Sequence, residues 1–296
     1  MANTNGGMQG KVVMVTGANA GLGKQTALEL AKMGATLVCV SRDKARGEAA
    51  VAEIKRESGN EKVELMLADL SSQKSIRAFA EEFKRKHAKL HVLVNNAGVV
   101  NPERTVTPDG IESTFALNHL GYFLLTHQLL DVLKASAPAR IINLASEAQR
   151  MGHINFEDIG GEKKFSSFRA YSQSKLANIM FSYDLAKRLE GTGVTVNAVH
   201  PGAVATNFGK EMKGLLGFVF KKLGRRFMRT AEQGAQTSIY LASSPEVEGV
   251  TGKYFADSKP LKSNKESYDE NVRRKLWELS EKLTGVSYAQ SVKASA

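Results

Sequence analysis

The 296-residue chain has a single cysteine, Cys39, and no long apolar run. One cysteine excludes an internal disulfide, so the composition suits a reducing compartment. Cys39 lies within the apolar run from Leu37 to Val40, where we expect a core thiol rather than a reactive one. The N-terminus lacks the basic and apolar regions of a signal peptide, and no apolar run approaches the roughly 20 residues that span a bilayer. We therefore predict a cytoplasmic protein.

Signs of a nucleic-acid partner are also missing. Basic residues outnumber acidic ones by 41 to 30, which gives a net charge of +11. More than half of this excess is local, because residues 210–229 hold seven basic side chains and one acidic side chain. The sequence has no zinc-ligand spacing, homeodomain-like pattern or aromatic-rich RNA motif. We predict no nucleic-acid partner and no metal site.

Short β-branched or apolar runs alternate with longer amphipathic segments along the chain. This pattern is typical of a parallel sheet with helices on both faces, so we predict an α/β fold with one doubly wound, seven-stranded parallel sheet. The single domain is expected over residues 10–285, with loose tails at 1–9 and 287–296. Predicted strands cover 11–16, 36–41, 63–68, 91–95, 140–145, 194–199 and 253–256. Predicted helices cover 24–33, 43–57, 73–87, 111–135, 167–190 and 231–242, followed by a surface excursion at 258–267 and a last amphipathic helix around Trp277.

A glycine-rich turn, Thr16 to Gly23, follows the first predicted strand and precedes the first predicted helix. A helix start exposes unpaired N–H groups and the positive end of its dipole, and glycines let a pyrophosphate approach this backbone without meeting a Cβ atom. The spacing G-x-x-x-G-x-G differs from the G-x-G-x-x-G of the standard dinucleotide fingerprint. The turn therefore predicts a dinucleotide site, with an ordinary tight turn between strand and helix as the alternative.

The end of the second predicted strand indicates which dinucleotide binds. In many dinucleotide-binding proteins an acidic residue there accepts the ribose 2′-hydroxyl of NAD, whereas an arginine suits the 2′-phosphate of NADP. Ser41 stands where the acid would be expected, Arg42 follows, and Asp43 lies where it can cap the next helix. We predict NADPH/NADP+ rather than NADH; the alternative is that Arg42 is an ordinary surface arginine.

A tyrosine and a lysine stand four residues apart, at Tyr171 and Lys175. On one helical face the ammonium lies beside the phenol, where it favours phenolate and lowers the tyrosine pKa from about 10 toward neutrality. A tyrosine of lowered pKa is a useful acid-base group. Such a pair also occurs by chance in many helices, so its meaning depends on the residues around it.

Further motifs complete a family pattern. In their order and spacing they make the chain, from about Gly10 to about Gly285, resemble the short-chain dehydrogenase/reductase family with its single-domain Rossmann fold. Segments 152–158, 171–178 and 252–255 are similar to the retinol dehydrogenase-like branch, which is akin to protochlorophyllide reductases. The motifs that carry the resemblance are Thr16 to Gly23, Asp69, Asn95 to Gly98, Asn118, Ser146, Tyr171 with Lys175, and Pro201-Gly202.

The resemblance implies a catalytic set. Tyr171 would donate the proton to the carbonyl oxygen, and Lys175 would lower the tyrosine pKa and hold the nicotinamide ribose. Ser146 would hydrogen-bond the substrate oxygen, and Asn118 would anchor a water that relays protons. Taken singly, Asn118 could instead be a core amide and Ser146 a strand cap.

The resemblance also implies a cofactor-binding set. Asp69 would contact the adenine, Asn95 the adenosine side, and Thr206 the nicotinamide amide or the pyrophosphate. Asp69 alone could equally be a helix cap. The implied set is Gly17, Asn19, Gly21, Leu22, Gly23, Arg42, Asp69, Leu70, Asn95, Ala97, Gly98, Tyr171, Lys175, Pro201, Gly202, Val204 and Thr206.

The branch implies an NADP-dependent oxidoreductase that transfers hydride between the nicotinamide and a lipophilic aldehyde or ketone, or the corresponding alcohol. Two other functions stay open. One is a non-catalytic NADPH sensor or scaffold, although such relatives commonly lose the tyrosine or lysine that this chain keeps. The other is light-driven reduction of the protochlorophyllide type, which is weakened because Cys39 is the only cysteine, so that none is expected near the pocket.

The segment after Pro201-Gly202 mixes apolar and basic side chains. We expect an apolar lid over the substrate at about 207–229, with a basic outer face. The alternatives are a surface helix packed on the core and a contact of residues 210–229 with an anionic membrane surface. The long helix expected at 111–135 is the face we predict for a possible homodimer.

Overall fold

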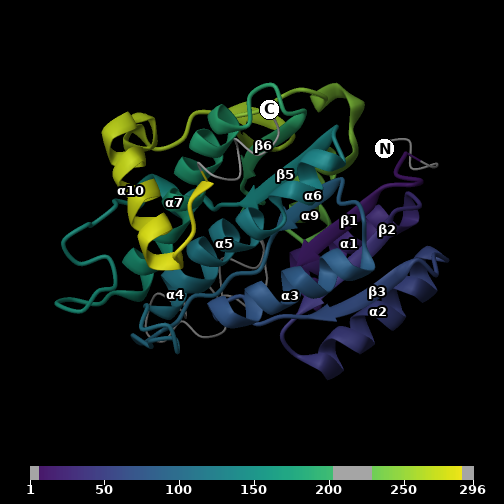
Figure 1. Cartoon of the computed structure of the whole chain (residues 1–296), viewed down its shortest axis with the longest axis horizontal. Coiled ribbons are helices and arrows are strands. Elements are labelled where there is room, and N and C mark those ends of the chain that lie inside the picture. Colours follow the sequence, from purple (N-terminus) through teal and green to yellow (C-terminus); the bar gives the residue numbers. More distant parts are fainter. Residues whose placement is uncertain (1–6, 203–228, 289–296) are drawn as a thin grey trace.

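The computed structural model describes residues 7–202 and 229–288, which share one sheet (Figure 1). Seven strands run parallel and an eighth lies antiparallel at one edge, in the order β3-β2-β1-β4-β5-β6-β7-β8. The parallel α/β fold is thus confirmed, with one strand more than predicted. The strands are β1 (Val12–Thr16), β2 (Thr36–Ser41), β3 (Val63–Leu67), β4 (Val92–Asn95), β5 (Ala139–Leu144), β6 (Val194–Val199), β7 (Lys253–Ala256) and β8 (Lys259–Leu261).

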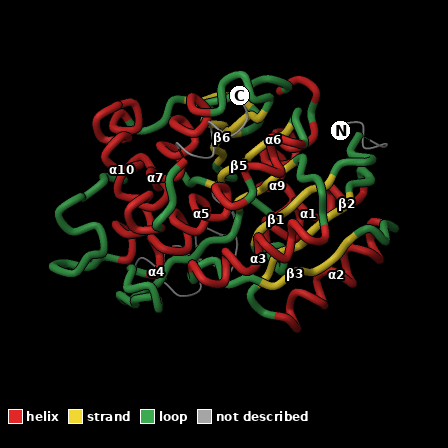
Figure 2. Tube along the Cα trace, viewed as in Figure 1, coloured by secondary structure: helices red, strands yellow, loops and turns green. Residues whose placement is uncertain are grey.

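Helices cover both faces of this sheet (Figure 2). None of the described helices is long and apolar enough to cross a membrane. The longer helices are α1 (Gly21–Lys32), α2 (Lys44–Ser58), α3 (Gln73–Lys86), α5 (Gly121–Gln128), α6 (Leu130–Ala135), α7 (Ser167–Arg188), α9 (Ala231–Ser243) and α10 (Glu270–Thr284). Shorter turns are α4 (Ser113–Phe115), the π-helix η1 (Ala116–Leu120), and the 3-10 helices η2 (Glu147–Met151), η5 (Pro245–Val247) and η6 (Lys265–Tyr268).

Two hydrophobic cores flank the sheet because successive strand residues point to opposite faces. Met14 and Val38 pack with α3, α5, α7 and α10, whereas Val13 and Leu37 pack with α1 and α9. All four side chains are fully buried, and each such burial stabilises the fold by about 1.5–3 kcal/mol. Double burial explains why these strands read as continuous apolar runs rather than as alternating ones.

The helix predicted over 111–135 is in fact four consecutive segments, α4, η1, α5 and α6. The π-helical turn Ala116–Leu120 interrupts it, and Leu129 leaves helical geometry with φ −105° and ψ 5°. Gly121 lies at the junction because a Cβ atom there would come within 2.6 Å of the Leu70 carbonyl oxygen. Periodicity alone does not reveal such a break, since the apolar positions continue through it.

Strand β8 is the strand that the sequence pattern missed, in the segment predicted as a surface excursion. Asp257 and Ser258 both have positive φ, 51° and 58°, as a two-residue hairpin turn requires. The turn folds Lys259–Leu261 back onto β7. All three residues of β8 are exposed, so the strand carries no alternation of apolar and polar residues that would predict it.

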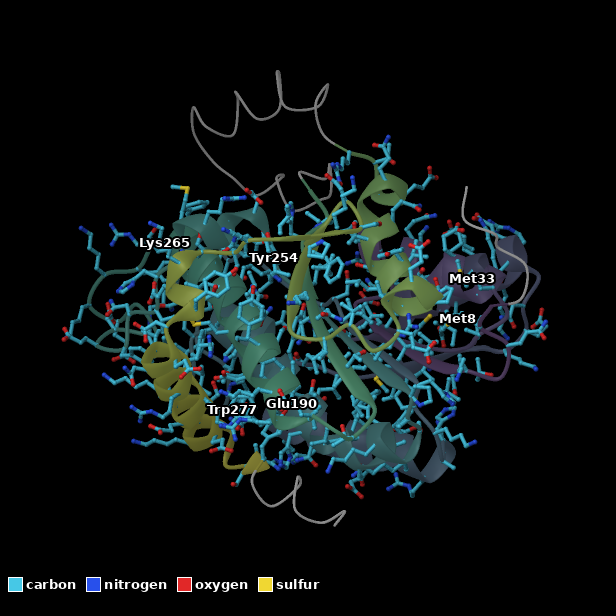
Figure 3. All side chains as sticks on the ribbon, turned by 90° about the horizontal axis from the view of Figure 1, so that it is seen from above. Met8, Met33, Glu190, Tyr254, Lys265 and Trp277 are labelled. Atoms are coloured by element: carbon cyan, nitrogen blue, oxygen red, sulfur yellow. The ribbon has the colours of Figure 1, made fainter. Side chains whose placement is uncertain are left out.

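The packed part of the chain extends past both predicted domain limits. Met8 is buried and its N–H donates to the Met33 carbonyl oxygen at 3.1 Å; Figure 3 shows the two side by side. Tyr288 is buried against Trp277, with ring centroids 4.9 Å apart, and its hydroxyl donates to the Phe123 carbonyl at 2.7 Å. For these residues the prediction of loose tails was wrong, because a large apolar side chain anchors each end.

Candidate functional site

The predicted site residues gather at the carboxyl ends of the parallel strands. The order of the strands reverses between β1 and β4, so the connections leave these two neighbours in opposite directions and open a crevice at their carboxyl ends. Thr16 ends β1, Asn95 ends β4 and Leu144 ends β5. Ligands of open α/β sheets bind at this edge.

The glycine turn brings bare backbone to the start of α1. Gly17 has φ 67° and Gly21 has φ 54°, which a side chain would strain. A Cβ atom on Gly23 would lie 2.3 Å from the Gly17 carbonyl oxygen, so only glycine fits there. Asn19 and Leu22 are partly exposed on the same turn. These residues form the compact cradle that a pyrophosphate needs.

Helix α1 differs from its neighbour α2 at the N-terminus. No side chain caps α1 at Ala20, and its first turn holds no acidic residue. In α2 the Asp43 side chain accepts a hydrogen bond from the Arg46 N–H at 3.0 Å. The first N–H groups of α1 therefore remain available to an anion, as the dipole of the helix favours.

Thr16 and Asn96 brace this turn, and Asn96 was not among the predicted site residues. The Thr16 hydroxyl accepts from the N–H groups of Asn96 and Ala97 at 2.8 and 3.0 Å. The Asn96 amide donates back to the Thr16 carbonyl at 2.8 Å. The ends of β1 and β4 are thereby locked together. The adjacent amides Asn95 and Asn96 were the available signal for this role.

Arg42 lies at the end of β2 with an exposed side chain. Among residues 7–202 and 229–288, no side chain or backbone group bonds its guanidinium, whereas Ser41 beside it is buried. Asp43 caps α2, as predicted, so its carboxylate is engaged away from Arg42. An exposed arginine next to the β1 crevice can meet a 2′-phosphate without breaking a bond first.

Asp69 and Leu70 follow β3. Asp69 does not cap α3; its carboxylate accepts from the Ser71 N–H at 3.0 Å and from the Ser71 hydroxyl at 2.6 Å. The helix cap is Ser72. Leu70 is buried, so only its backbone can contribute to a cofactor site. The partly exposed Asp69 remains suited to the predicted adenine contact.

Asn95 has a structural role in place of the predicted cofactor contact. Its side chain is fully buried, and its amide nitrogen donates to the Thr126 hydroxyl at 3.1 Å and to the Asn143 side-chain oxygen at 2.8 Å. These bonds tie β4 to α5 and β5. The side chain points into the core and so is not available for the predicted adenosine contact; a contact through the Asn95 backbone stays a prediction.

The reaction centre combines α7 with the end of β5. Tyr171 is partly exposed and hydrogen-bonds Ser146, the residue that caps η2 through its bond from the Ala148 N–H. Lys175 is buried and its ammonium nitrogen donates to the Leu144 carbonyl at 3.0 Å. The same nitrogen lies 5.7 Å from the ring centroid of Tyr171. The three predicted side chains are therefore brought together.

The pKa values of this pair differ from the prediction. Burial raises the pKa of Tyr171 to about 12, and the hydrogen bond from Ser146 only partly opposes this rise. Burial also lowers the pKa of Lys175 to about 7. The prediction that the lysine lowers the tyrosine pKa was wrong for the chain alone, because desolvation penalises both charged forms more than their proximity helps. The phenol is consequently neutral and holds its proton.

Asn118 lies in the π-helical turn η1, a distortion often found at functional sites. Its side-chain oxygen accepts from the Val99 N–H at 2.8 Å, and its nitrogen donates to the Val99 carbonyl at 2.9 Å and to the Ser174 hydroxyl at 3.0 Å. It therefore locks the loop after β4 to α7. A water bound by Asn118 stays a prediction.

Gly98 lies directly beside the reaction centre. A Cβ atom there would come within 3.3 Å of the Asn118 side-chain oxygen and 3.4 Å of the Lys175 nitrogen. Gly98 itself is exposed and its neighbour Ala97 is partly exposed. Because Gly98 has no side chain, nothing from this position covers the Asn118 side chain and the Lys175 ammonium.

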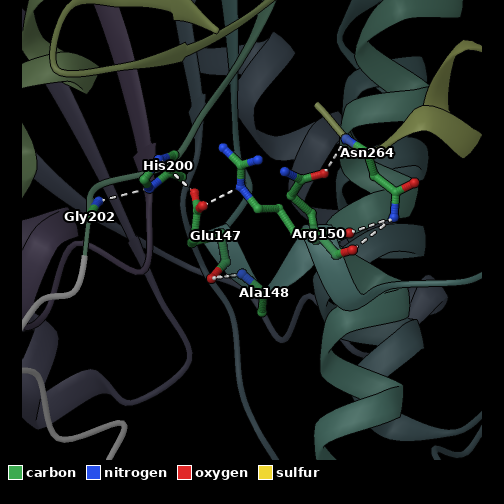
Figure 4. A network of polar contacts seen from close by, with 8 residues as sticks. Glu147, Ala148, Arg150, His200, Gly202 and Asn264 are labelled. Carbon is green, nitrogen blue, oxygen red and sulfur yellow. Dashed lines mark hydrogen bonds and ion pairs between the residues drawn. The ribbon is translucent and has the colours of Figure 1, made fainter. Parts of the chain in front are cut away.

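His200 lies between Glu147, the residue after Ser146, and Gly202 (Figure 4). Its Nε2 lies 3.1 Å from the Glu147 carboxylate, and its Nδ1 accepts from the Gly202 N–H at 3.0 Å. Burial lowers the pKa of His200 although Glu147 opposes the shift. Gly202 has φ 81° and packs against Arg229, where a Cβ atom would lie 2.8 Å from the guanidinium. Val204, Thr206 and the predicted lid, except Arg229, lie outside the described residues.

Comparisons of the sequence and of the structure with known proteins give relatives of one kind. A family model described as short chain dehydrogenase matches residues 11–214. Human retinol dehydrogenase 14 is 46% identical over 294 residues, which cover 94% of this chain and 88% of the relative. An uncharacterised protein from Mycobacterium paratuberculosis is similar in structure, with a TM-score of 0.79, 32% identity and 97% of both chains covered. The NADP active-site complex of Pseudomonas aeruginosa RhlG is 28% identical, with a TM-score of 0.67 and coverage of 83% of this chain and 94% of that one.

Proposed function

The chain belongs to the short-chain dehydrogenase family and is an oxidoreductase of alcohols or carbonyl compounds, and on that premise we propose that it transfers hydride between NADP(H) and a lipophilic aldehyde or ketone, or the matching alcohol. One observation carries the proposal. The hydroxyl groups of Ser146 and Tyr171 and the ammonium of Lys175 converge at the end of β5, beside the glycine turn.

The residues support the chemistry as follows. A bound nicotinamide would supply or accept the hydride. Ser146 donates a hydrogen bond to the substrate oxygen and holds it against Tyr171. In reduction, the carbonyl carbon gains hydride with two electrons, and the Tyr171 hydroxyl gives its proton to the oxygen. The resulting phenolate is stabilised by Lys175, and in alcohol oxidation the proton travels the opposite way.

Two observations support NADP as the cofactor. Arg42 is exposed at the end of β2 with its guanidinium uncommitted among the described residues, and Asp43 is engaged in capping α2. The relative from Pseudomonas aeruginosa forms its active-site complex with NADP. An arginine at this position suits the 2′-phosphate, which NADH lacks.

Exposed apolar side chains on the two elements that carry Ser146 and Tyr171 support a lipophilic substrate. Met151 ends η2 with 73% of its surface exposed, and Phe168 is 47% exposed one turn before Tyr171. The two elements are packed together, since a Cβ atom on Gly152 would lie 2.6 Å from the Ser172 carbonyl. Exposed apolar side chains next to a catalytic group are typical of a binding surface. The match to retinol dehydrogenase 14 supports a retinol-type alcohol or its aldehyde.

The remaining parts of the proposal concern partners. We propose a cytoplasmic enzyme whose segment 210–229 covers the substrate or meets an anionic membrane surface, with a homodimer formed through the helices between residues 111 and 135. Sedimentation with acidic lipid vesicles at low and high salt tests the membrane contact. Sedimentation equilibrium of the purified chain tests the dimer.

The decisive experiment measures NADPH absorbance with the purified chain. Retinal, long-chain aldehydes and aromatic ketones form one panel, and short polar aldehydes such as glyceraldehyde form the other. We expect faster turnover with the apolar panel, and with NADPH rather than NADH. NADPH binding without turnover of any substrate would indicate a sensor, and preference for NADH would refute the cofactor assignment.

A further inference from the structure

The Leu144 carbonyl oxygen, at the end of β5, is shared between two donors from α7. The Lys175 ammonium donates to it at 3.0 Å and the Asn178 amide nitrogen donates at 3.1 Å. All three residues are buried. The orientation of the Asn178 amide therefore helps to decide how firmly this carbonyl holds the lysine.

The bonds continue from Asn178 to the C-terminal helix α10. The side-chain oxygen of Asn178 lies 3.4 Å from His119 Nδ1, and His119 Nε2 lies 2.9 Å from the Ser280 hydroxyl. Both His119 and Ser280 are fully buried, and neither takes part in the proton transfer described above. A chain of polar contacts thus joins α10 to the reaction centre.

Donors and acceptors allow one consistent direction along this chain. The Asn178 nitrogen must face Leu144, because a carbonyl accepts and does not donate, so its oxygen faces His119. This oxygen needs a donor, which makes Nδ1 the protonated nitrogen of His119. Nε2 then accepts from the Ser280 hydroxyl.

The opposite arrangement places two acceptors against each other. If Ser280 donated to the Leu276 carbonyl, 2.7 Å away, its oxygen would accept from a protonated Nε2 of His119. The bare Nδ1 would then face the Asn178 oxygen, and turning the amide would aim that oxygen at Leu144 instead. An unmatched pair of acceptors inside the core is costly, whereas the Leu276 carbonyl already accepts an amide N–H within α10.

We propose that His119, in its Nδ1–H form and held by Ser280, is a positioning residue that sets the Asn178 amide and through it the Leu144 carbonyl and the Lys175 ammonium. The proposal extends the catalytic role proposed for Lys175 and rests on it. It makes α10 part of the machinery that holds the lysine.

The surroundings of His119 suit this role. The ring centroid of Phe115 lies 5.0 Å from that of His119, and the ring of Phe181 meets it edge-on at 6.2 Å. Burial lowers the pKa of His119 to about 4, and the hydrogen bond to the Asn178 side chain opposes this shift. A neutral imidazole surrounded by apolar side chains keeps one tautomer. Hydrogen bonds are strong in such surroundings, and the other tautomer would leave a ring nitrogen facing a partner that it cannot pair with.

The first experiment reads the tautomer directly, without an assay of activity. The nitrogen-15 shifts of the histidine rings are recorded on the full-length chain at neutral pH, and the His119 signals are assigned as those missing from a His119→Gln sample. We expect a protonated Nδ1 and a bare Nε2. A protonated Nε2, or a doubly protonated ring, would overturn the proposal whatever the enzyme acts on.

The second experiment compares two buried hydroxyls of α10. Ser280→Ala removes the donor to His119, whereas Thr284→Val removes a hydroxyl one turn later whose bonds, within the described part of the chain, are to backbone carbonyls. We expect kcat to fall about tenfold in Ser280→Ala and to change little in Thr284→Val. If the Asn178 amide no longer donates to the Leu144 carbonyl, that carbonyl accepts from the Lys175 ammonium alone. The pKa of Lys175 should then rise, and the limb of the pH profile that reports it should move to higher pH.

Ser280→Thr keeps the hydroxyl and should restore both kcat and the pH profile. Equal kcat and equal pH profiles for Ser280→Ala and Thr284→Val would refute the positioning role. If the native chain turns over no substrate, the proposed function fails, while the nitrogen-15 measurement still decides the tautomer.

Discussion

The reaction centre and the end of β2 are built in opposite ways. At the reaction centre, Lys175 is buried and bonded to backbone, and Tyr171 is bonded to Ser146. At the end of β2, Arg42 is exposed, with its guanidinium uncommitted among the described residues. The first region is held by bonds within the protein, whereas the second would be completed by the proposed contact with a 2′-phosphate.

This difference suggests that one region sets the catalytic rate and the other sets the choice between cofactors. Groups that stabilise a transition state must be oriented in advance, because reorganisation during the reaction would cost part of the gain. A group that distinguishes two cofactors needs only a different free energy with each of them. We therefore expect large losses of rate from changes at the reaction centre and smaller, cofactor-specific effects from changes at β2.

The largest effect should come from Tyr171→Phe, which removes the proton donor and leaves the ring in place. We expect kcat/KM to fall by about 10²- to 10⁴-fold, as for loss of a general acid. Steady-state rates of NADPH oxidation with an apolar aldehyde measure this. The matched control is Tyr183→Phe on the same helix, whose hydroxyl bonds Ser263 at 2.8 Å rather than Ser146. Equal rates for the two variants would contradict the assignment.

Lys175→Met should lower kcat by about 10²-fold while making the fold more stable. The pKa of Lys175 falls from an ordinary 10.5 to about 7, so at pH 7 and below its charge is held in the core at a cost. Replacing it with a side chain of similar length and no charge should raise the free energy of unfolding by about 2–4 kcal/mol near pH 7. Urea denaturation of the two proteins measures the difference.

The pH dependence of that difference follows from proton counts. Between pH 7 and about 10.5 the unfolded lysine binds its proton and the folded lysine releases it, so the stability of the native chain rises with pH through this window. Lys175→Met lacks this rise. The gap between the two proteins should therefore shrink from pH 7 toward pH 10, and a gap that stayed constant would refute the lowered pKa.

Arg42→Asp should have a smaller effect that depends on the cofactor. Loss of an interaction with a charged phosphate corresponds to about a 10- to 100-fold rise in KM for NADPH, since the carboxylate also repels the phosphate. The KM for NADH should change little or decrease. If Arg42→Asp and the native chain gave the same NADPH kinetics, another residue would have to select the cofactor.

Asp43→Ala should have the smallest effect and only on stability. It removes the cap of α2, so the free energy of unfolding should fall by about 1 kcal/mol. Asp43 caps α2, whereas the proposed pyrophosphate site lies at the uncapped start of α1. We therefore expect kcat and the KM for NADPH to stay within about twofold of the native values. A large rise in KM would show that Asp43 takes part in cofactor binding.

The sequence was most informative at positions where the local backbone or the chemistry of the site requires a particular residue type. Strands β2, β6 and β7 begin and end at the predicted residues, and Ser146, Tyr171 and Lys175 meet as predicted. Glycine positions such as Gly23 were predictable because a Cβ atom there has no room. Each of these features depends on a residue type that few others can replace.

The misses share a different cause, which is the contribution of distant neighbours. The family resemblance implied a cofactor contact for Asn95, yet Thr126 and Asn143 hold its side chain inside the core. The pKa of Tyr171 depends on the depth of burial, which no local pattern reports. His119 and Ser280 meet across 161 positions, so their contact follows only from the packing of α10.

Strand β8 affects how readily one edge of the sheet can pair with another molecule. It is three residues long, all exposed, and its middle residue is Pro260, which has no N–H to offer. A short, proline-bearing outer strand that begins with Lys259 and is followed by Lys262 is a poor template for a strand from another molecule. The hairpin therefore protects the β7 edge against fibril-like growth, and deletion of the turn and β8 should expose that edge to self-association.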